Sequence, residues 1–198
     1  MESKGIDMQK VSKQGGFTLV EIAIVLVIIG LLLGGVLKGQ EMIKNAEIRS
    51  VISDVQGLRT ALYAYRDRYN ALPGDDKNAI VNSSSATDVA KGNGNGQIKV
   101  VGTLKEDEQF FLQLRAAKLI TGTGVTGANH ALGGATTVAY QTYTNSLGNE
   151  ICLADVPGAD AIILEAKEDD GSPSTGSILG HNTETAYGTG TYTLCFEI

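Results

Sequence analysis

The stretch from Lys13 to Leu37, KQGGFTLVEIAIVLVIIGLLLGGVL, decides the fold of this chain. From Phe17 onward, its 21 residues include a single charged side chain, that of Glu21. A helix of this length spans roughly 30 Å, which matches the hydrocarbon core of a bilayer. The segment from Phe17 to Leu37 is therefore long enough and apolar enough to cross a membrane.

The charges that precede this segment predict its orientation. Three lysines, Lys4, Lys10 and Lys13, stand there against two acids, Glu2 and Asp7. Because short flanking segments rich in lysine stay on the cytoplasmic side, we expect the amino terminus in the cytoplasm. The long remainder of the chain would then be exported.

Three other interpretations of the apolar segment remain open. A conventional cleaved secretory signal has a shorter apolar core without a carboxylate, and Gly34-Gly35 is a poor substitute for its small-x-small cleavage site. A plain membrane anchor explains the lysines and the length. It leaves Glu21 unexplained, because an unpaired carboxylate in lipid is costly. A buried core helix fits least well with so long an apolar run near the amino terminus.

The junction as a whole resembles the processing site of type IV prepilins and of type II secretion pseudopilins. The resemblance rests on the basic segment, the Gly15-Gly16 pair, Phe17, and Glu21 at the fifth position of the apolar segment. It is strong over residues 13 to about 70 and general over the rest of the chain. It implies an α+β type IV pilin fold, in which a long amino-terminal helix packs against a small antiparallel β-sheet.

The resemblance also implies how the chain is processed and assembled. In this family a prepilin peptidase cleaves after the glycine, here Gly16, and the new terminal amine, here that of Phe17, is methylated. Glu21 is then expected to pair with the Phe17 amine of a neighbouring subunit. Because either charge alone is costly in lipid, this pairing would favour correct subunit addition. The implied partners are the peptidase/methyltransferase, an inner-membrane pilus assembly platform, the membrane and further copies of the chain.

Four parts follow from these observations: a leader over residues 1–16, a transmembrane or filament-core helix over 17–37, its amphipathic continuation over 38–72, and a globular head over 73–198. Before assembly, the chain is expected in the inner membrane with a single pass and a cytoplasmic amino terminus. After assembly, it is expected in an extracellular filament. The formal net charge of −6 argues against nucleic-acid binding by bulk electrostatics.

Beyond Leu37 the apolar residues recur at steps of three and four, which predicts an amphipathic helix that continues to Tyr69. The Leu72-Pro73-Gly74 sequence is expected to end it. The apolar face consists of Ile48, Val51, Ile52, Val55, Leu58, Leu62, Tyr65 and Tyr69.

The head is expected to contain a surface connection, one helix and a sheet. Residues 75–104 are rich in Ser, Asn, Gly and Lys, and the GNGNG sequence at 92–96 is the clearest turn signal. A second helix is predicted over 106–120, with acids at its start and Lys118 near its end. Runs of β-branched and aromatic residues predict strands over 136–143, 150–153, 161–165 and 191–196.

Cys152 and Cys195 are the only two cysteines and lie in predicted strands of an exported head, so a disulfide between them is expected. Because the bonded positions are 43 apart in sequence, it would contribute roughly 4 kcal/mol to stability in the chain-entropy estimate. Type IVa pilins commonly close a carboxy-terminal loop in this way, whereas major pseudopilins usually do not. The cysteine pair therefore favours a pilus subunit.

Two segments were compared with calcium sites. The loop around Asn93 and Asn95 matches part of a calcium-loop pattern, but Lys91 and Gly102 occupy the first and twelfth ligand positions. The acids Glu165, Glu168, Asp169 and Asp170 could bind calcium, as the heads of major pseudopilins do. An acid-rich turn on a solvated hairpin would explain the same four residues without a metal.

No spacing motif selects a catalytic site, and no cofactor other than this calcium is indicated. The sequence therefore favours a structural subunit of a type IV pilus-like filament. A type II secretion pseudopilin or a minor pilin is the alternative within the same fold. A membrane-anchored periplasmic binding or enzymatic protein is the alternative of another class.

Overall fold

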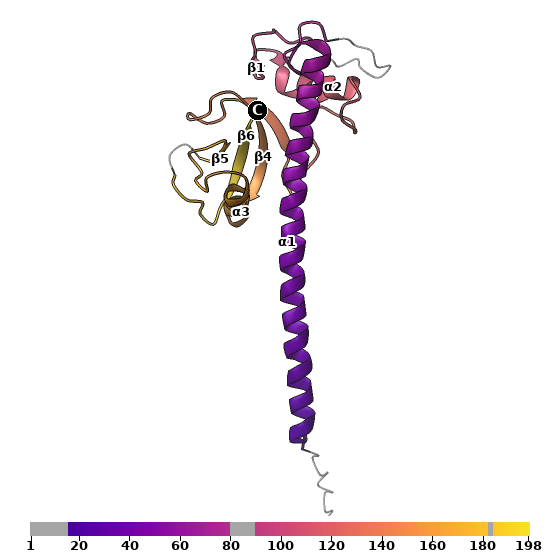
Figure 1. Ribbon diagram of the computed structural model, residues 1–198, viewed down its shortest axis with the longest axis vertical. Coiled ribbons are helices and arrows are strands. Elements are labelled where there is room, and N and C mark those ends of the chain that lie inside the picture. Colours follow the sequence, from indigo (N-terminus) through magenta and orange to yellow (C-terminus); the bar gives the residue numbers. More distant parts are fainter. Residues whose placement is uncertain (1–15, 80–89, 182–183) are drawn as a thin grey trace, which may run out of the picture. The chain divides into compact units, whose positions relative to one another are not determined.

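The computed structural model describes residues 16–79, 90–181 and 184–198 (Figure 1). The chain divides between Ile43 and Lys44 into two compact units. Helix α1 (Leu19–Tyr69) contributes residues to both units, and the remaining elements belong to the second. These are β1 (Val100–Val101), β2 (Leu104–Lys105), α2 (Glu106–Ala116), β3 (Thr136–Tyr140), β4 (Asn149–Pro157), α3 (Gly158–Glu168), β5 (Ile178–Leu179) and β6 (Thr191–Glu197).

The first unit contains the apolar part of α1. Every residue from Gly16 to Leu37 is exposed, including large side chains such as Leu31, which is 73% exposed. The helix continues through Gly30, Gly34 and Gly35 to Tyr69, although each glycine weakens a helix by up to about 1 kcal/mol relative to alanine. A long apolar helix therefore forms as predicted, and no described residue of its own unit covers it.

The part of α1 in the second unit is amphipathic, and its apolar face is buried. Ile48, Val51, Val55, Leu62 and Tyr65 are buried in the core of the head. Of the other predicted face positions, Ile52 and Leu58 are partly buried, and Tyr69 at the helix end is exposed. The predicted change from an apolar to an amphipathic pattern is confirmed.

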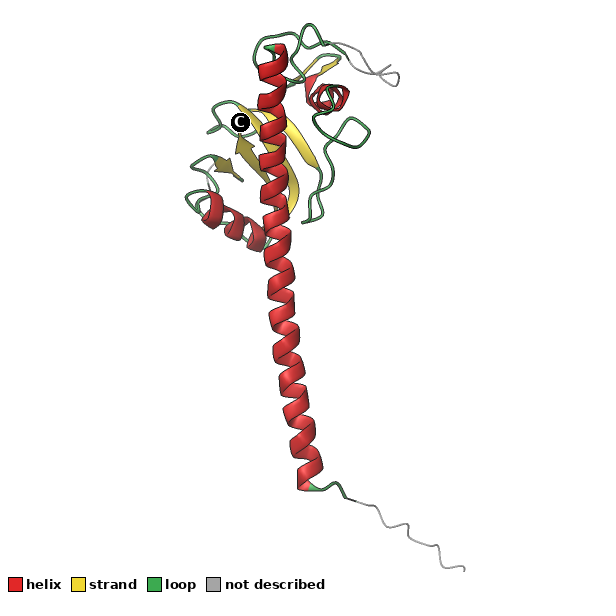
Figure 2. Cartoon of the chain, turned by 45° about the vertical axis from the view of Figure 1, so that its right-hand side comes forward, coloured by secondary structure: helices red, strands yellow, loops and turns green. Residues whose placement is uncertain are grey.

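The head contains a four-stranded antiparallel sheet with the strand order β3-β4-β6-β5, and β1 and β2 form a separate two-stranded hairpin. The carboxy-terminal part of α1 crosses one face of this sheet (Figure 2). Apolar residues of the sheet, such as Ile151 and Leu194, share one hydrophobic cluster with α1 and with Phe110 of α2. The α+β fold with a long amino-terminal helix and a small antiparallel sheet is thus confirmed, and it fits the type IV pilin fold.

The chain turns sharply after α1, as the Pro73-Gly74 sequence predicts. Gly74 has a positive φ of 88°, and a Cβ there would lie 2.4 Å from the carbonyl oxygen of Glu106. Its N–H donates to Oε1 of Gln113 over 2.7 Å. The hydroxyl of Tyr65 donates to Oδ2 of Asp76 over 2.8 Å, which ties the turn back to α1. Glycine is therefore required at 74 by both conformation and space.

One predicted strand is wrong: residues 161–165 lie within helix α3. Ala161, Leu164 and Glu165 are buried while Ile162 is half-exposed, which is the spacing of a helix face and not the alternation of a strand. A short apolar run cannot be assigned by periodicity alone, and here alanine, leucine and glutamate favour the helix. The predicted helix over 106–120 also ends earlier, at Ala116.

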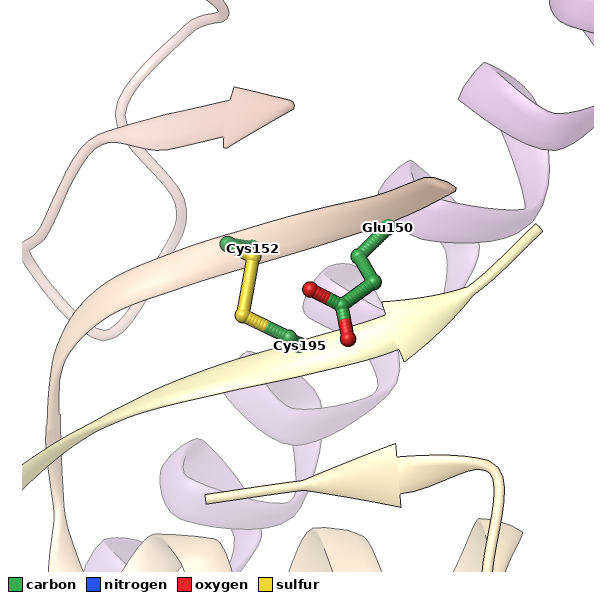
Figure 3. Close-up of side chains that lie close together, drawn as sticks. All are labelled: Glu150, Cys152 and Cys195. Carbon is green, nitrogen blue, oxygen red and sulfur yellow. A yellow bond between two sulfur atoms is a disulfide. The ribbon is translucent and has the colours of Figure 1, made fainter. Parts of the chain in front are cut away.

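The predicted disulfide is present between Cys152 on β4 and Cys195 on β6, which stand directly opposite each other in the sheet (Figure 3). Both residues are buried. The bond links the two central strands at a sequence separation of 43, and the segment between the cysteines includes α3 and β5.

Removal of this disulfide by the double substitution Cys152→Ala/Cys195→Ala is expected to lower the free energy of unfolding by about 4 kcal/mol, because the unfolded chain regains the entropy of the closed loop. Chemical denaturation of the head would measure it, and the reduced wild type is the matched control. A double variant as stable as the oxidised wild type would contradict this expectation.

Candidate functional site

The predicted cleavage point lies at the exposed start of the described chain. Phe17 is 82% exposed, and Gly16 is exposed as well. A Cβ built on Gly16 would meet no atom of the described chain within 4 Å. A glycine at this position is therefore not required by packing against the described residues, and cleavage after Gly16 stays a prediction.

Glu21 closes the first turn of α1 together with Thr18. Both the backbone N–H and the hydroxyl of Thr18 donate to Oε2 of Glu21, over 2.8 and 2.7 Å. The N–H of Glu21 points back to the Thr18 hydroxyl over 3.3 Å. This reciprocal pattern is a capping box, which satisfies donors that a helix start otherwise leaves without partners.

The capping box defines the state of Glu21 in a single chain. Its carboxylate has partners from Thr18, so the helix start is satisfied before any neighbour is present. The Phe17 nitrogen still belongs to the peptide bond with Gly16, so the amine expected to pair with Glu21 exists only after cleavage. Thr18 was missed as a functional residue, although the spacing of Thr18 and Glu21 matches the capping-box pattern.

Residues 11–37 match the family model of the prokaryotic N-terminal methylation motif. The chain carries a prepilin-type amino terminus. This motif supports, in general terms, a type IV pilin-like or pseudopilin subunit, and it implies processing by a prepilin peptidase. No curated protein and no solved structure matches the chain.

Among the described residues, α1 is the one helix with the length and composition needed to cross a membrane. Its most apolar window is exposed along its whole length. Together with the methylation motif, this helix indicates that the pilin-like subunit is anchored in a membrane before assembly. The helix start with Gly16, Phe17 and Glu21 is therefore the candidate functional site.

The structure brings together three of the four acids considered for calcium. Carboxylate oxygens of Glu165, Asp169 and Asp170 lie within 4.8 Å of one another, whereas Glu168 is exposed and does not belong to this group. The acids lie at the end of α3 and not on a hairpin, as one interpretation of the sequence assumed. Calcium binding here stays a prediction.

Hydrogen bonds within the chain already hold two of these carboxylates. Asp169 accepts the N–H of Ile178 over 2.7 Å, and Asp170 accepts the N–H of Ser172 over 2.9 Å and the hydroxyl of Thr175. These contacts order the loop from α3 to β5. The loop therefore has a structural explanation that needs no metal.

A second group of potential ligands, Glu150, Cys152 and Cys195, lies in the sheet (Figure 3). Both sulfurs belong to the disulfide and cannot act as thiolate ligands. Glu150 is buried and accepts the N–H of Thr142 over 2.9 Å. This group is therefore structural.

Glu165 is fully buried and only half satisfied. The hydroxyl of Tyr187 donates to its Oε1, while its Oε2 has no hydrogen-bond partner among the described residues. Burial raises the pKa of this carboxyl from 4.5 to about 7, and the charges of Asp169 and Asp170 add to the rise, against the effect of the Tyr187 hydrogen bond. A carboxyl group with no cation beside it is thus expected to keep its proton up to nearly neutral pH.

The stability of the head is expected to fall as pH rises from about 4.5 through about 7, because the folded chain binds the Glu165 proton more tightly than the unfolded chain. Glu165→Gln removes this titration and is expected to raise the free energy of unfolding above pH 7 by up to about 3 kcal/mol. Denaturation at several pH values, with a chelator present, would measure both effects.

The matched control for this measurement is Glu168→Gln, which removes an exposed carboxylate from the same helix. It is expected to leave the pH dependence of stability unchanged. Equal pH profiles for the wild type and the Glu165 variant would show that the buried carboxyl does not titrate in this range.

Proposed function

We propose that this chain is the structural subunit of an extracellular type IV pilus-like filament, cleaved after Gly16, methylated at Phe17 and polymerised through its amino-terminal helix. The observation that carries the proposal is the exposed apolar half of α1, which lies within the segment that matches the methylation motif. So large an apolar surface cannot stay in water. Lipid would cover it before assembly, and like helices of other copies would cover it in the filament.

The glycines of α1 support close packing between such helices. Gly30 and Gly34 are four residues apart, as are Gly35 and Gly39, so each pair lies on one helix face. A Cβ at any of these positions would meet no atom of the described chain within 4 Å beyond the helix's own backbone. In membranes, pairs of small residues at this spacing let two helices approach closely.

The head would form the outer shell of the filament, and its disulfide fits that place. The disulfide between Cys152 and Cys195 strengthens a small domain outside the cell, where disulfides persist. It also favours a pilus subunit over a major pseudopilin. The role proposed is structural and not enzymatic, with the peptidase/methyltransferase, the inner-membrane assembly platform, the membrane and identical subunits as partners.

A type II secretion pseudopilin is the second candidate, and the carboxylates of Glu165, Asp169 and Asp170 are the observation that favours it. Both candidates begin with the same insertion, in which the amino terminus stays cytoplasmic and the helix passes once through the inner membrane. They differ in the location of the polymer, which is the cell surface for a pilus and the envelope for a pseudopilin. Location and processing therefore have to be measured together.

The expected result of shearing filaments from the native cells is a dominant subunit of 182 residues that begins at methylated Phe17. Intact mass and amino-terminal fragment spectra would establish it. The variant Gly16→Leu is expected to remain as full-length precursor in the membrane without loss of folding, since no packing in the described chain requires this glycine.

Processed chain found only in the envelope fraction would favour a pseudopilin or minor pilin. An unprocessed wild type would indicate an ordinary anchored protein. Normal processing of the Gly16 variant would remove the peptidase step from the proposal.

Glu21 is expected to act in assembly through its charge and in helix capping through its oxygens. Glu21→Gln keeps an oxygen that can accept from Thr18 but loses the charge, whereas Glu21→Ala loses both. Both variants should insert and fold normally and reduce filament yield at least about tenfold, because the neighbour's Phe17 amine is left unpaired in an apolar surrounding.

The matched control is Thr18→Ala, which removes the hydroxyl of the cap and keeps the Glu21 charge. Filament yield in the sheared fraction, at equal levels of processed subunit in the membrane, is the measurement. Wild-type yield from Glu21→Gln cells would contradict charge pairing.

A further inference from the structure

The GNGNG loop is folded around a carboxylate and not around a cation. Asp75, which is nearly buried, accepts the backbone N–H groups of Gly94, of Asn95 over 3.1 Å and of Gly96 over 2.6 Å. Amide hydrogens that point inward form an anion site. The sequence of this loop matches a calcium loop only in part. In the structure its amides bind the negative charge of Asp75, which lies outside the loop.

The same loop contains the two Asn-Gly sequences of the chain, Asn93-Gly94 and Asn95-Gly96. Asparagine followed by glycine is chemically labile, since no side chain shields the next backbone nitrogen. That nitrogen loses its proton and attacks Cγ of the asparagine, a ring forms, and ammonia leaves. Water then opens the succinimide, so that the net change is asparagine plus water to aspartate or isoaspartate plus ammonia.

Both attacking nitrogens are the ones that Asp75 holds, since Gly94 donates to Oδ1 and Gly96 to Oδ2. A carboxylate is far too weak a base to remove an amide proton. Its negative charge also opposes the formation of the amide anion that must attack. The contacts therefore fix each peptide plane. They also raise the free energy of the amide anion, which is the species that attacks.

The two asparagine side chains are held as well. Oδ1 of Asn93 accepts the N–H of Asn95 over 3.0 Å, and Oδ1 of Asn95 accepts the N–H of Gln97 over 2.8 Å. Outside the loop, Oε1 of the buried Glu106 accepts the N–H of Asn93 over 2.9 Å. Ring closure at either site thus requires several hydrogen bonds to break together.

We propose that Asp75 protects both Asn-Gly sequences from succinimide formation, and that the loop becomes a deamidation site when Asp75 no longer holds it. Deamidation would place a new carboxylate beside Asp75, and isoaspartate would add a methylene to the backbone. Either product disfavours return of the loop to its original form. The protection belongs to the folded head and does not depend on filament formation.

The test is the rate of deamidation at Asn93 and Asn95 in the mature chain, incubated in mildly alkaline buffer. Trypsin cleaves after Lys91 and after Lys99 and so releases residues 92–99 as one peptide. Chromatography with mass spectrometry then separates its asparagine, aspartate and isoaspartate forms. Folded wild type is expected to react at least about tenfold more slowly than the same chain in denaturant. Equal rates would overturn the proposal.

The role of Asp75 itself is tested with Asp75→Asn, which keeps the shape of the side chain and removes its charge. Both sites are expected to react at least about tenfold faster than in folded wild type. The matched control Asp169→Asn removes another loop carboxylate that accepts a backbone N–H, that of Ile178, and Asn93 and Asn95 should react in it as they do in the wild type. A folded Asp75 variant that reacts no faster than wild type would overturn the proposal.

Hydrogen exchange in the wild type gives a second measurement that does not depend on the folding of any variant. The amides of Gly94 and Gly96 are expected to be protected, whereas that of Gly102, for which no hydrogen bond to a side chain is found in the described chain, serves as the comparison. Free exchange at Gly94 and Gly96 would show that Asp75 does not hold them and would equally overturn the proposal.

Discussion

The structure depends first on the apolar surface that α1 exposes between Leu19 and Leu37. The described residues of its own unit do not cover that surface. The free energy of leaving it in water grows with its area. A membrane or a bundle of like helices is the environment in which this segment is stable. In the proposed function, anchoring places this surface in lipid, and polymerisation moves it from lipid into a bundle of like helices.

The second half of the same helix has a different function, because its sequence is apolar on one face only. Ile48, Val51 and Val55 bury that face in the head, where they join the cluster that contains Phe110 and Ile151. The disulfide then connects the two central strands of the sheet. Helix α1 thus contributes to both units. Its first half needs other molecules to cover its apolar surface, and its second half packs in the core of the head.

Three carboxylates of the chain lie in three different environments. Glu21 caps the helix that carries it, Asp75 holds the amides of a distant loop, and Glu165 lies buried with one oxygen unsatisfied among the described residues. The cap follows from the spacing of two neighbouring residues. The other two arrangements depend on segments that are far apart in sequence, and this is why the residues looked like ordinary turn or surface acids.

The sequence by itself determined the apolar helix, its change to an amphipathic pattern, the cleavage motif and the pairing of the two cysteines. These are local or composition-driven properties, since helix periodicity, bilayer length and the presence of one cysteine pair need no knowledge of long-range contacts. The tertiary structure decided that residues 161–165 are helical, because a short apolar run fits either a strand or a helix, and the burial of Ala161, Leu164 and Glu165 follows a helix face. It alone placed Asp75 against Gly94 and Gly96, since about twenty residues separate them and only the packed fold brings them within hydrogen-bond distance.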